Sequence, residues 1–146
     1  MTGVQTCALP ISDANRLRLL LVEDEALIAM MAEDMIDSLN GHVVRTAATL
    51  AEALDACDSA VFDAALLDVN LNGDSSMPIA AVLKTRGCPF AFTTGYGSAG
   101  VDAVHGDMPV LTKPYALAEL AALLDGFRRQ LLGISSITSS VDSKRG

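Results

Sequence analysis

Five polar side chains in this sequence follow short apolar runs, and their types suit a site that accepts phosphate beside a metal ion. They are two adjacent acids, a third carboxylate, a hydroxyl and an amine, namely Glu23, Asp24, Asp68, Thr94 and Lys113. Apolar runs of this length between polar residues are typical of buried parallel strands. Ligands of open α/β sheets bind at the carboxyl ends of such strands, so we expect the five side chains to converge.

Carboxylates that lie this close together predict a bound cation, because they repel one another unless a cation binds or a pKa rises. Mg²⁺ accepts oxygen ligands, and proteins usually hold it with one or two carboxylates plus a phosphate group. Asp68 can take a phosphoryl group as an aspartyl phosphate, while Lys113 and the metal cancel charge on the transferred oxygens. Thr94 offers a hydroxyl donor to a phosphoryl oxygen, and the backbone carbonyl of Asn70 is placed to complete the metal shell.

The strands that must position these residues alternate with helical patterns. We predict strands at residues 17–22, 42–46, 62–67, 89–93 and 108–111, and helices at 25–39, 50–57, 79–85 and 116–132. This alternation implies right-handed crossovers and an α/β fold with a doubly wound five-stranded parallel sheet of order 2-1-3-4-5. The first helix is expected to turn its larger apolar residues inward, and these are Leu27, Met30, Met31, Met35 and Leu39.

Taken in order, the motifs resemble those of the receiver domain of two-component response regulators. The matching segments are Leu-Val-Glu-Asp-Glu at 21–25, Leu-Leu-Asp-Val-Asn-Leu at 66–71, Thr94 and Lys113-Pro114. The resemblance covers roughly residues 16–132 and implies a flavodoxin-like receiver fold. It also implies a function, which is to take a phosphoryl group from a histidine kinase or phosphotransferase and to switch the binding of another protein.

The resemblance also gives each site residue a role. It makes Asp68 the phosphoacceptor, Thr94 the switch hydroxyl and Lys113 the phosphate-pairing lysine. It implies that Mg²⁺ is held by Glu23, Asp24, Asp68 and the carbonyl of Asn70. It places kinase docking on the face formed by the first helix and the last helix, and it limits enzymatic activity to self-phosphotransfer and autodephosphorylation.

A narrower likeness lies at residues 89–96, Pro-Phe-Ala-Phe-Thr-Thr-Gly-Tyr. This segment is similar to the Phe-Ala-Thr-Gly-Tyr signature of a mostly alphaproteobacterial receiver subgroup, often paired with kinases of the HWE type, although Thr93 replaces the usual alanine. Val110 stands where many receivers carry a switching aromatic residue, so the output route would be Tyr96, Tyr115 or the glycine-rich stretch from Gly95 to Gly106. Because glycine disfavours helix, we expect a short fourth helix there.

Two other classes of protein share parts of this pattern. Phosphohydrolases of the haloacid dehalogenase type also use an aspartyl nucleophile with Mg²⁺, but they usually carry an acid two residues later, where this chain has Asn70. A flavodoxin-like cofactor binder would place small or hydroxyl residues after the first strand, where Glu23 and Asp24 would repel a phosphate. A degenerate receiver that acts only as a binding module is a further alternative, against which the complete residue set argues.

Composition and charge restrict the partners and the location. The chain has 146 residues, 51% of them hydrophobic, which fits one domain with a full core. The net charge of −8 argues against binding to nucleic acid or to an anionic membrane. No apolar run reaches the roughly 18 residues of a membrane span, and no secretory signal is evident, so we expect a cytoplasmic protein. Cys7, Cys57 and Cys88 show no metal-binding spacing and are expected to be reduced thiols.

The two ends of the chain differ from its middle. We expect residues 1–15 to be a non-native or disordered leader, because residues 1–11 match the translation of a common sequencing adapter. The true gene would then continue upstream, and the domain at 16–132 would be either a free-standing regulator or the terminal receiver of a hybrid kinase. Residues 133–146 are rich in serine and lack apolar periodicity, so we expect a disordered tail.

Overall fold

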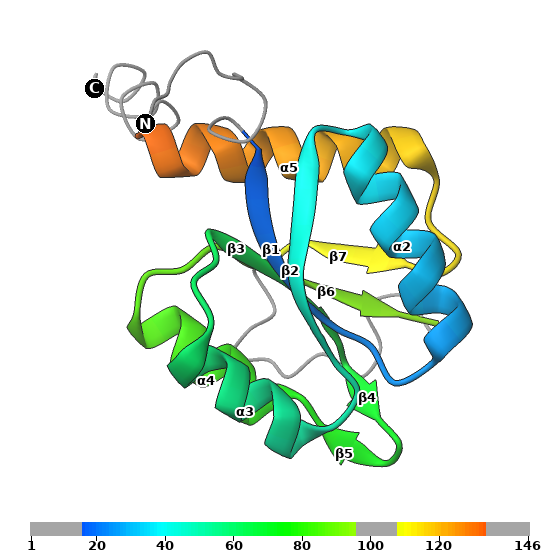
Figure 1. Cartoon of the computed structure of the whole chain (residues 1–146), viewed down its shortest axis with the longest axis vertical. Coiled ribbons are helices and arrows are strands. Elements are labelled where there is room, and N and C mark those ends of the chain that lie inside the picture. The colour runs from blue at the N-terminus through cyan, green and yellow to red at the C-terminus, as the bar shows by residue number, and fades with distance from the viewer. Residues whose placement is uncertain (1–15, 96–107, 134–146) are drawn as a thin grey trace, which may run out of the picture.

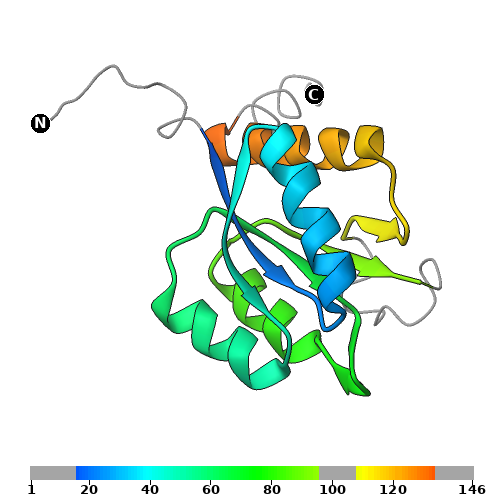
Figure 2. The same cartoon turned by 45° about the vertical axis from the view of Figure 1, so that its right-hand side comes forward.

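The computed structural model describes residues 16–95 and 108–133, which form a parallel sheet between two layers of helices (Figure 1, Figure 2). The sheet has the order β2-β1-β3-β6-β7, and every neighbouring pair of strands in it is parallel. Numbered along the chain, this is the predicted order 2-1-3-4-5, so the doubly wound fold is confirmed. The strands are β1 (Leu17–Val22), β2 (Gly41–Ala47), β3 (Ala64–Asp68), β6 (Phe90–Thr94) and β7 (Val110–Thr112).

The helices pack against the sheet in two pairs. Helices α2 (Ala26–Ser38) and α5 (Leu117–Leu132) cover one face, and α3 (Leu50–Ser59) and α4 (Met77–Thr85) cover the other (Figure 1). Each face has its own buried cluster, one around Leu19, Leu66 and Leu124 and the other around Leu20, Leu67 and Phe92. Alternate residues of a strand point to opposite faces, so the continuous apolar runs of β1 and β3 fill both clusters.

All predicted boundaries of the described helices and main-sheet strands lie within two residues of the observed ones, and β1 matches fully. The difference from the prediction that matters most for the site is at the ends of β3 and β6. Asp68 and Thr94 are the last residues of these strands and not the first residues after them. Helix α4 begins at Met77, earlier than predicted, with Pro78 in its first turn. Proline is tolerated there because the first helical N–H groups have no partner within the helix.

The predicted inward face of the first helix is wrong. Leu27, Met30 and Met31 are exposed by 70%, 60% and 53%, while Met35 and Leu39 only pack partly buried against the core. The helix instead buries a stripe of mostly smaller residues, Ala29, Ala32 and Ile36. Both stripes have helical spacing, and alanines let the helix approach the sheet closely. Side-chain size misled the prediction, because it assigned the larger residues to the core.

A small hairpin after β3 was not predicted. Strands β4 (Asn70–Leu71) and β5 (Asp74–Ser75) pair antiparallel around a two-residue turn. Asn72 and Gly73 form this turn with positive φ angles of 54° and 93°. Asn-Gly between two short extended segments is the strongest local signal for such a turn, so the sequence did carry the information.

Two arginines bind the C-terminal ends of helices near the edge of the sheet where the strands begin. Arg128 of α5 donates to the carbonyl oxygens of Leu39 and Asn40 just after α2, at 2.9 Å each. Arg86 donates in the same way to the carbonyl oxygen of Cys57 in the last turn of α3. The last carbonyls of a helix lack partners within the helix, so these contacts satisfy groups that would otherwise need water.

Several predictions concern residues outside the described ranges. These are the leader at 1–15, the short fourth helix, Tyr96 and the tail beyond Gly133, while Gly133 itself ends α5 with a φ of 76°. Among the residues at 16–95 and 108–133, no helix is long and apolar enough to cross a membrane.

Gly126 lies in the interior of α5, and a Cβ added there would meet no heavy atom within 4 Å. We therefore expect Gly126→Ala to raise the free energy of unfolding by up to about 1 kcal/mol, because alanine removes the helix penalty of glycine. Urea unfolding measures this change. Gly41→Ala is the contrasting variant, since its Cβ would lie 2.7 Å from Cγ2 of Ile36, and it should destabilise the fold. A destabilised Gly126→Ala protein would contradict the expectation.

Candidate functional site

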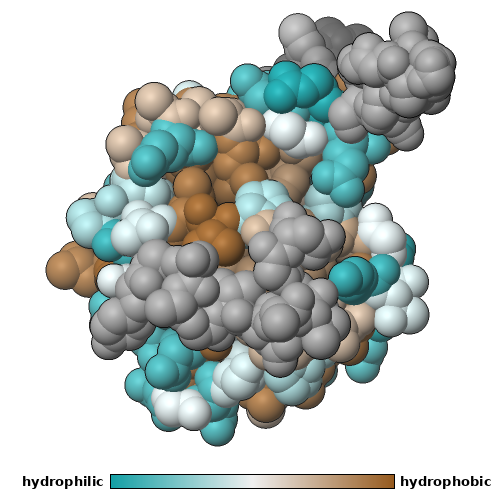
Figure 3. All heavy atoms as spheres, turned by 180° about the vertical axis from the view of Figure 1, so that it is seen from behind, coloured by the Kyte–Doolittle hydropathy of each residue, from teal (hydrophilic) through white to brown (hydrophobic). Residues whose placement is uncertain are grey.

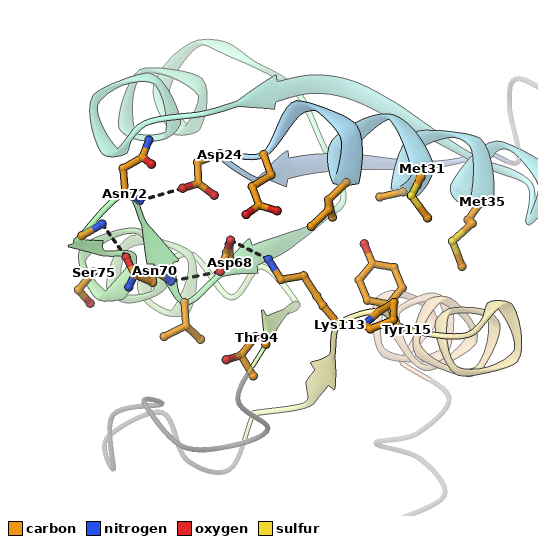
Figure 4. A pocket seen from close by; sticks show the side chains of 17 residues that line it. Asp24, Met31, Met35, Asp68, Asn70, Asn72, Ser75, Thr94, Lys113 and Tyr115 are labelled. Atoms are coloured by element: carbon orange, nitrogen blue, oxygen red, sulfur yellow. Dashed lines mark hydrogen bonds and ion pairs between the residues drawn. The ribbon is translucent and has the colours of Figure 1, made fainter.

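The five side chains singled out in the sequence meet at the carboxyl ends of the strands, and Figure 4 shows four of them, Asp24, Asp68, Thr94 and Lys113. Glu23 and Asp24 follow β1, Asp68 ends the central strand β3, Thr94 ends β6, and Lys113 follows β7. These strands are neighbours in the sheet, so their parallel pairing brings the four strand ends to one edge. The predicted convergence is confirmed by this arrangement.

Lys113 lies between two buried carboxylates. Its Nζ atom is 3.0 Å from Oδ2 of Asp68 and 3.2 Å from Oε1 of Glu23. The side chains of Lys113, Glu23 and Asp68 are exposed by only 14%, 3% and 7%. Charges this well shielded interact more strongly than surface pairs, and removing one partner leaves the other buried without compensation.

The three carboxylates form a group that fits a divalent cation. Glu23, Asp24 and Asp68 each offer an oxygen, and these oxygens lie within 4.8 Å of one another. One ammonium group faces this cluster of three acids, which leaves it negative when all are ionised. Hard oxygen donors in this number suit Mg²⁺, whose remaining ligands would be water molecules.

The electrostatics of the cluster act on Glu23 and Lys113. Burial raises the pKa of Glu23 to about 7, with a smaller contribution in the same direction from the charge of Asp68. Burial alone would lower the pKa of Lys113, but its hydrogen bond to Asp68 and the negative charges of Asp68 and Glu23 raise it. Lys113 therefore stays an ammonium at neutral pH.

The hairpin after β3 is hydrogen-bonded to the same carboxylates. The N–H of Asn72 donates to Oδ2 of Asp24 at 2.9 Å, and the N–H of Asn70 donates to Oδ1 of Asp68 at 3.2 Å (Figure 4). The side-chain oxygen of Asn70 accepts from the N–H of Gly73 at 2.7 Å. Asn70 was singled out in the sequence, whereas the part played by Asn72 was missed.

Thr94 and Lys113 are tied together through the main chain. The N–H of Lys113 donates to the carbonyl oxygen of Thr94 at 2.7 Å, and Thr94 pairs with Thr112 across β6 and β7. Thr94 is buried and lines the cleft that contains Asp68. Val110, an aliphatic residue at the start of β7, packs partly buried against the core.

A cleft of about 780 Å³ opens over the site and extends along α2. One end holds Asp24, Asp68 and Lys113, and Figure 4 shows Met31, Met35 and Tyr115 at the other. Burial raises the pKa of the Tyr115 phenol to about 12, so it is a protonated hydrogen-bond donor at neutral pH. The cleft can thus accept a charged group together with an apolar one.

A second cleft has a different character. Its volume is about 460 Å³, and it lies between α5 and the beginnings of β6 and β7. Seen from behind, hydrophobic side chains gather in the middle of the surface next to α5 (Figure 3). Of the described residues that line this cleft, Lys84 is the only charged one, so the cleft has no set of groups for phosphate chemistry.

Comparisons with known proteins agree with this geometry. The sequence model of the response regulator receiver domain matches residues 19–125. The transcriptional regulatory protein TcrA of Mycobacterium tuberculosis is 35% identical over 121 residues, which are 77% of this chain and 46% of TcrA. The sensor histidine kinase AruS of Pseudomonas aeruginosa is 32% identical over 130 residues, 79% of this chain and 12% of AruS. The chain thus spans less than half the length of these relatives.

Solved structures of other proteins are also similar to this chain. The solution structure of SdrG from Sphingomonas melonis Fr1 is 42% identical, with a TM-score of 0.70, and covers 77% of this chain and 96% of SdrG. The receiver domain of the response regulator PhyR from Erythrobacter litoralis is 26% identical, with a TM-score of 0.69, and covers 79% of this chain and 92% of that domain.

The raised pKa of Glu23 predicts a pH-dependent stability in metal-free buffer. The folded protein holds a proton on Glu23 up to about pH 7, whereas an unfolded chain releases it near the ordinary value of 4.5. The free energy of unfolding should therefore fall between about pH 5 and 8, by up to about 3 kcal/mol.

Urea unfolding at several pH values with a chelator present tests this expectation. Glu23→Gln should flatten the slope, while Asp34→Asn, which changes an exposed carboxylate of α2, should leave it as in the wild type. A Glu23→Gln protein with the wild-type slope would show that another group causes the pH dependence.

Proposed function

This chain belongs to the family of response regulator receiver domains, and we propose that it accepts a phosphoryl group on Asp68. The observation that carries the proposal is the position of Asp68, whose carboxylate ends the central strand beside the Lys113 ammonium and within 4.8 Å of two further acids. We assign the receiver domain to residues 16–132, and its chemistry is its own phosphorylation and dephosphorylation.

The acidic cluster is the proposed Mg²⁺ site. The ligands would be Asp24, Asp68 and the carbonyl oxygen of Asn70, with Glu23 bound directly or through water. The oxygen donors and the excess negative charge of the cluster fit this ion. When bound, Mg²⁺ would withdraw charge from the oxygens of the transferred phosphoryl group.

In the proposed transfer, an ionised carboxylate oxygen of Asp68 attacks the phosphorus of a phosphohistidine. The P–O bond forms as the P–N bond breaks, and its electron pair leaves with the imidazole nitrogen. Lys113, which pairs with Asp68 before transfer, then holds a phosphoryl oxygen with its ammonium group. The Thr94 hydroxyl donates to another phosphoryl oxygen and so senses that the group has arrived.

We propose a histidine kinase or phosphotransferase as the donor and the α2 and α5 face as its docking surface. Leu27, Met30 and Met31 expose large apolar side chains on α2, and Met31 also lines the cleft that leads to Asp68. An apolar strip that continues into the site suits a partner helix that carries the phosphohistidine. The likeness of residues 89–96 to one receiver subgroup supports a kinase of the HWE or a related type, in the cytoplasm.

Intact-protein mass after incubation with Mg²⁺ and acetyl phosphate tests the phosphoacceptor. We expect the wild type to gain one phosphoryl group and Asp68→Asn to gain none, because the amide is not a nucleophile of comparable strength. A chelator should abolish the gain in the wild type. Equal labelling of wild type and Asp68→Asn would contradict the assignment of Asp68.

The docking surface has a separate test. Leu27→Gln should slow transfer from a phosphorylated histidine kinase by about fivefold, since it removes a large apolar contact, but should leave labelling by acetyl phosphate unchanged. Val61→Gln is a matched control, because Val61 is 69% exposed and Leu27 is 70% exposed. An equal effect of both variants would argue against docking on α2.

A further inference from the structure

The turn at Asn72 and Gly73 touches the proposed metal site through the backbone. We infer that this turn is a positioning device that sets the affinity of the site for Mg²⁺ by holding Asp24 in place. The inference rests on the proposed function and adds residues that lie outside the carboxylate cluster itself.

The contact between the turn and Asp24 joins distant parts of the chain. The N–H of Asn72 donates to Oδ2 of Asp24 at 2.9 Å, across 48 positions in the sequence (Figure 4). No other hydrogen bond from the described residues reaches this carboxylate. The orientation of Asp24 therefore depends on where the tip of the hairpin lies.

The base of the hairpin is fixed more firmly than its tip. Leu71 is 1% exposed in the core cluster, and the N–H of Ser76 donates to the carbonyl oxygen of Val69 at 3.1 Å. At the tip, the N–H of Gly73 donates to the side chain of Asn70 at 2.7 Å. Apart from the pairing of β4 with β5, the tip is held by this bond and by Asp24, so the conformation of the turn and the position of the carboxylate are coupled.

Gly73 makes this conformation accessible. Its φ of 93° is one that residues with a Cβ rarely adopt, while a Cβ built there would meet no heavy atom within 4 Å. An alanine at this position therefore strains the backbone without a steric clash. A strained turn can relax by opening, which would move the N–H of Asn72 away from Asp24.

An open turn would weaken metal binding. The carboxylate would then sample several orientations in the free protein, and binding would have to restore the closed turn along with its strain. Preorganised ligands bind more tightly because this ordering is already complete. We expect the dissociation constant for Mg²⁺ to rise about three- to tenfold in Gly73→Ala.

Isothermal titration with MgCl₂ on the full chain, without any phosphodonor, measures this change. Gly87→Ala is the matched control, because Gly87 has a φ of 69°, also has open space around its Cβ position, and directly follows the C-cap of α4, away from the site. Both variants should lose stability in urea, but only Gly73→Ala should lose Mg²⁺ affinity. Gly73→Asn should recover part of the affinity, since asparagine tolerates positive φ.

Hydrogen exchange at the amide of Asn72 provides a second readout. The amide should be protected in the metal-free wild type and should exchange faster in Gly73→Ala. Equal Mg²⁺ affinity in Gly73→Ala and Gly87→Ala would overturn the inference, as would an unprotected Asn72 amide in the wild type. A wild type that binds no Mg²⁺ would instead overturn the proposed metal site, so the two failures are distinguishable.

Discussion

The structure depends on how one buried ammonium group is shared by two buried carboxylates. Lys113 lies 3.0 Å from Asp68 and 3.2 Å from Glu23, and Asp24 adds a third acid to the cluster. One positive charge does not neutralise three acids, and burial raises the pKa of Glu23 to about 7. The site is therefore electrostatically costly when it is empty, and a divalent cation relieves that cost. The same imbalance that weakens the fold without a cation favours the proposed binding of a metal ion and, with it, of a phosphoryl group.

The sheet supplies the free energy that offsets this cost. Residues such as Leu19, Leu20, Leu66 and Leu67 are fully buried in β1 and β3, and burying each side chain of this kind contributes roughly 2 kcal/mol. Helix ends are held at the opposite edge, where Arg128 bonds to carbonyls after α2 and Arg86 to one in α3. The edge formed by the carboxyl ends of the strands can therefore carry polar groups. The strand ends stay in place there although the carboxylates on them repel one another.

The sequence allowed the meeting of these side chains to be predicted because they follow apolar runs that are typical of buried strands. The prediction that Asp68 and Lys113 lie together required no knowledge of side-chain packing, since parallel pairing alone brings strand ends together. The buried face of α2 could not be predicted in this way, because the stripe with Leu27 and the stripe with Ala29 have the same period. Only close packing against the sheet decides which stripe is buried. The bond from Asn72 to Asp24 could not be predicted locally, because it joins residues 48 positions apart.

The orientation of α2 links the core to the proposed partner surface. Ala29 and Ala32 are buried, which lets the helix lie close to the sheet directly after the acidic pair. A helix that buried its methionines instead would stand farther away, and its first turn, with the preceding Glu23 and Asp24, would shift with it. The buried stripe of small residues therefore sets the position of Glu23 and Asp24, while the side chains of Leu27 and Met30 are exposed and available to another molecule. An exposed apolar strip of this kind disfavours the isolated protein in water, so its presence beside the site favours a role in binding a partner helix.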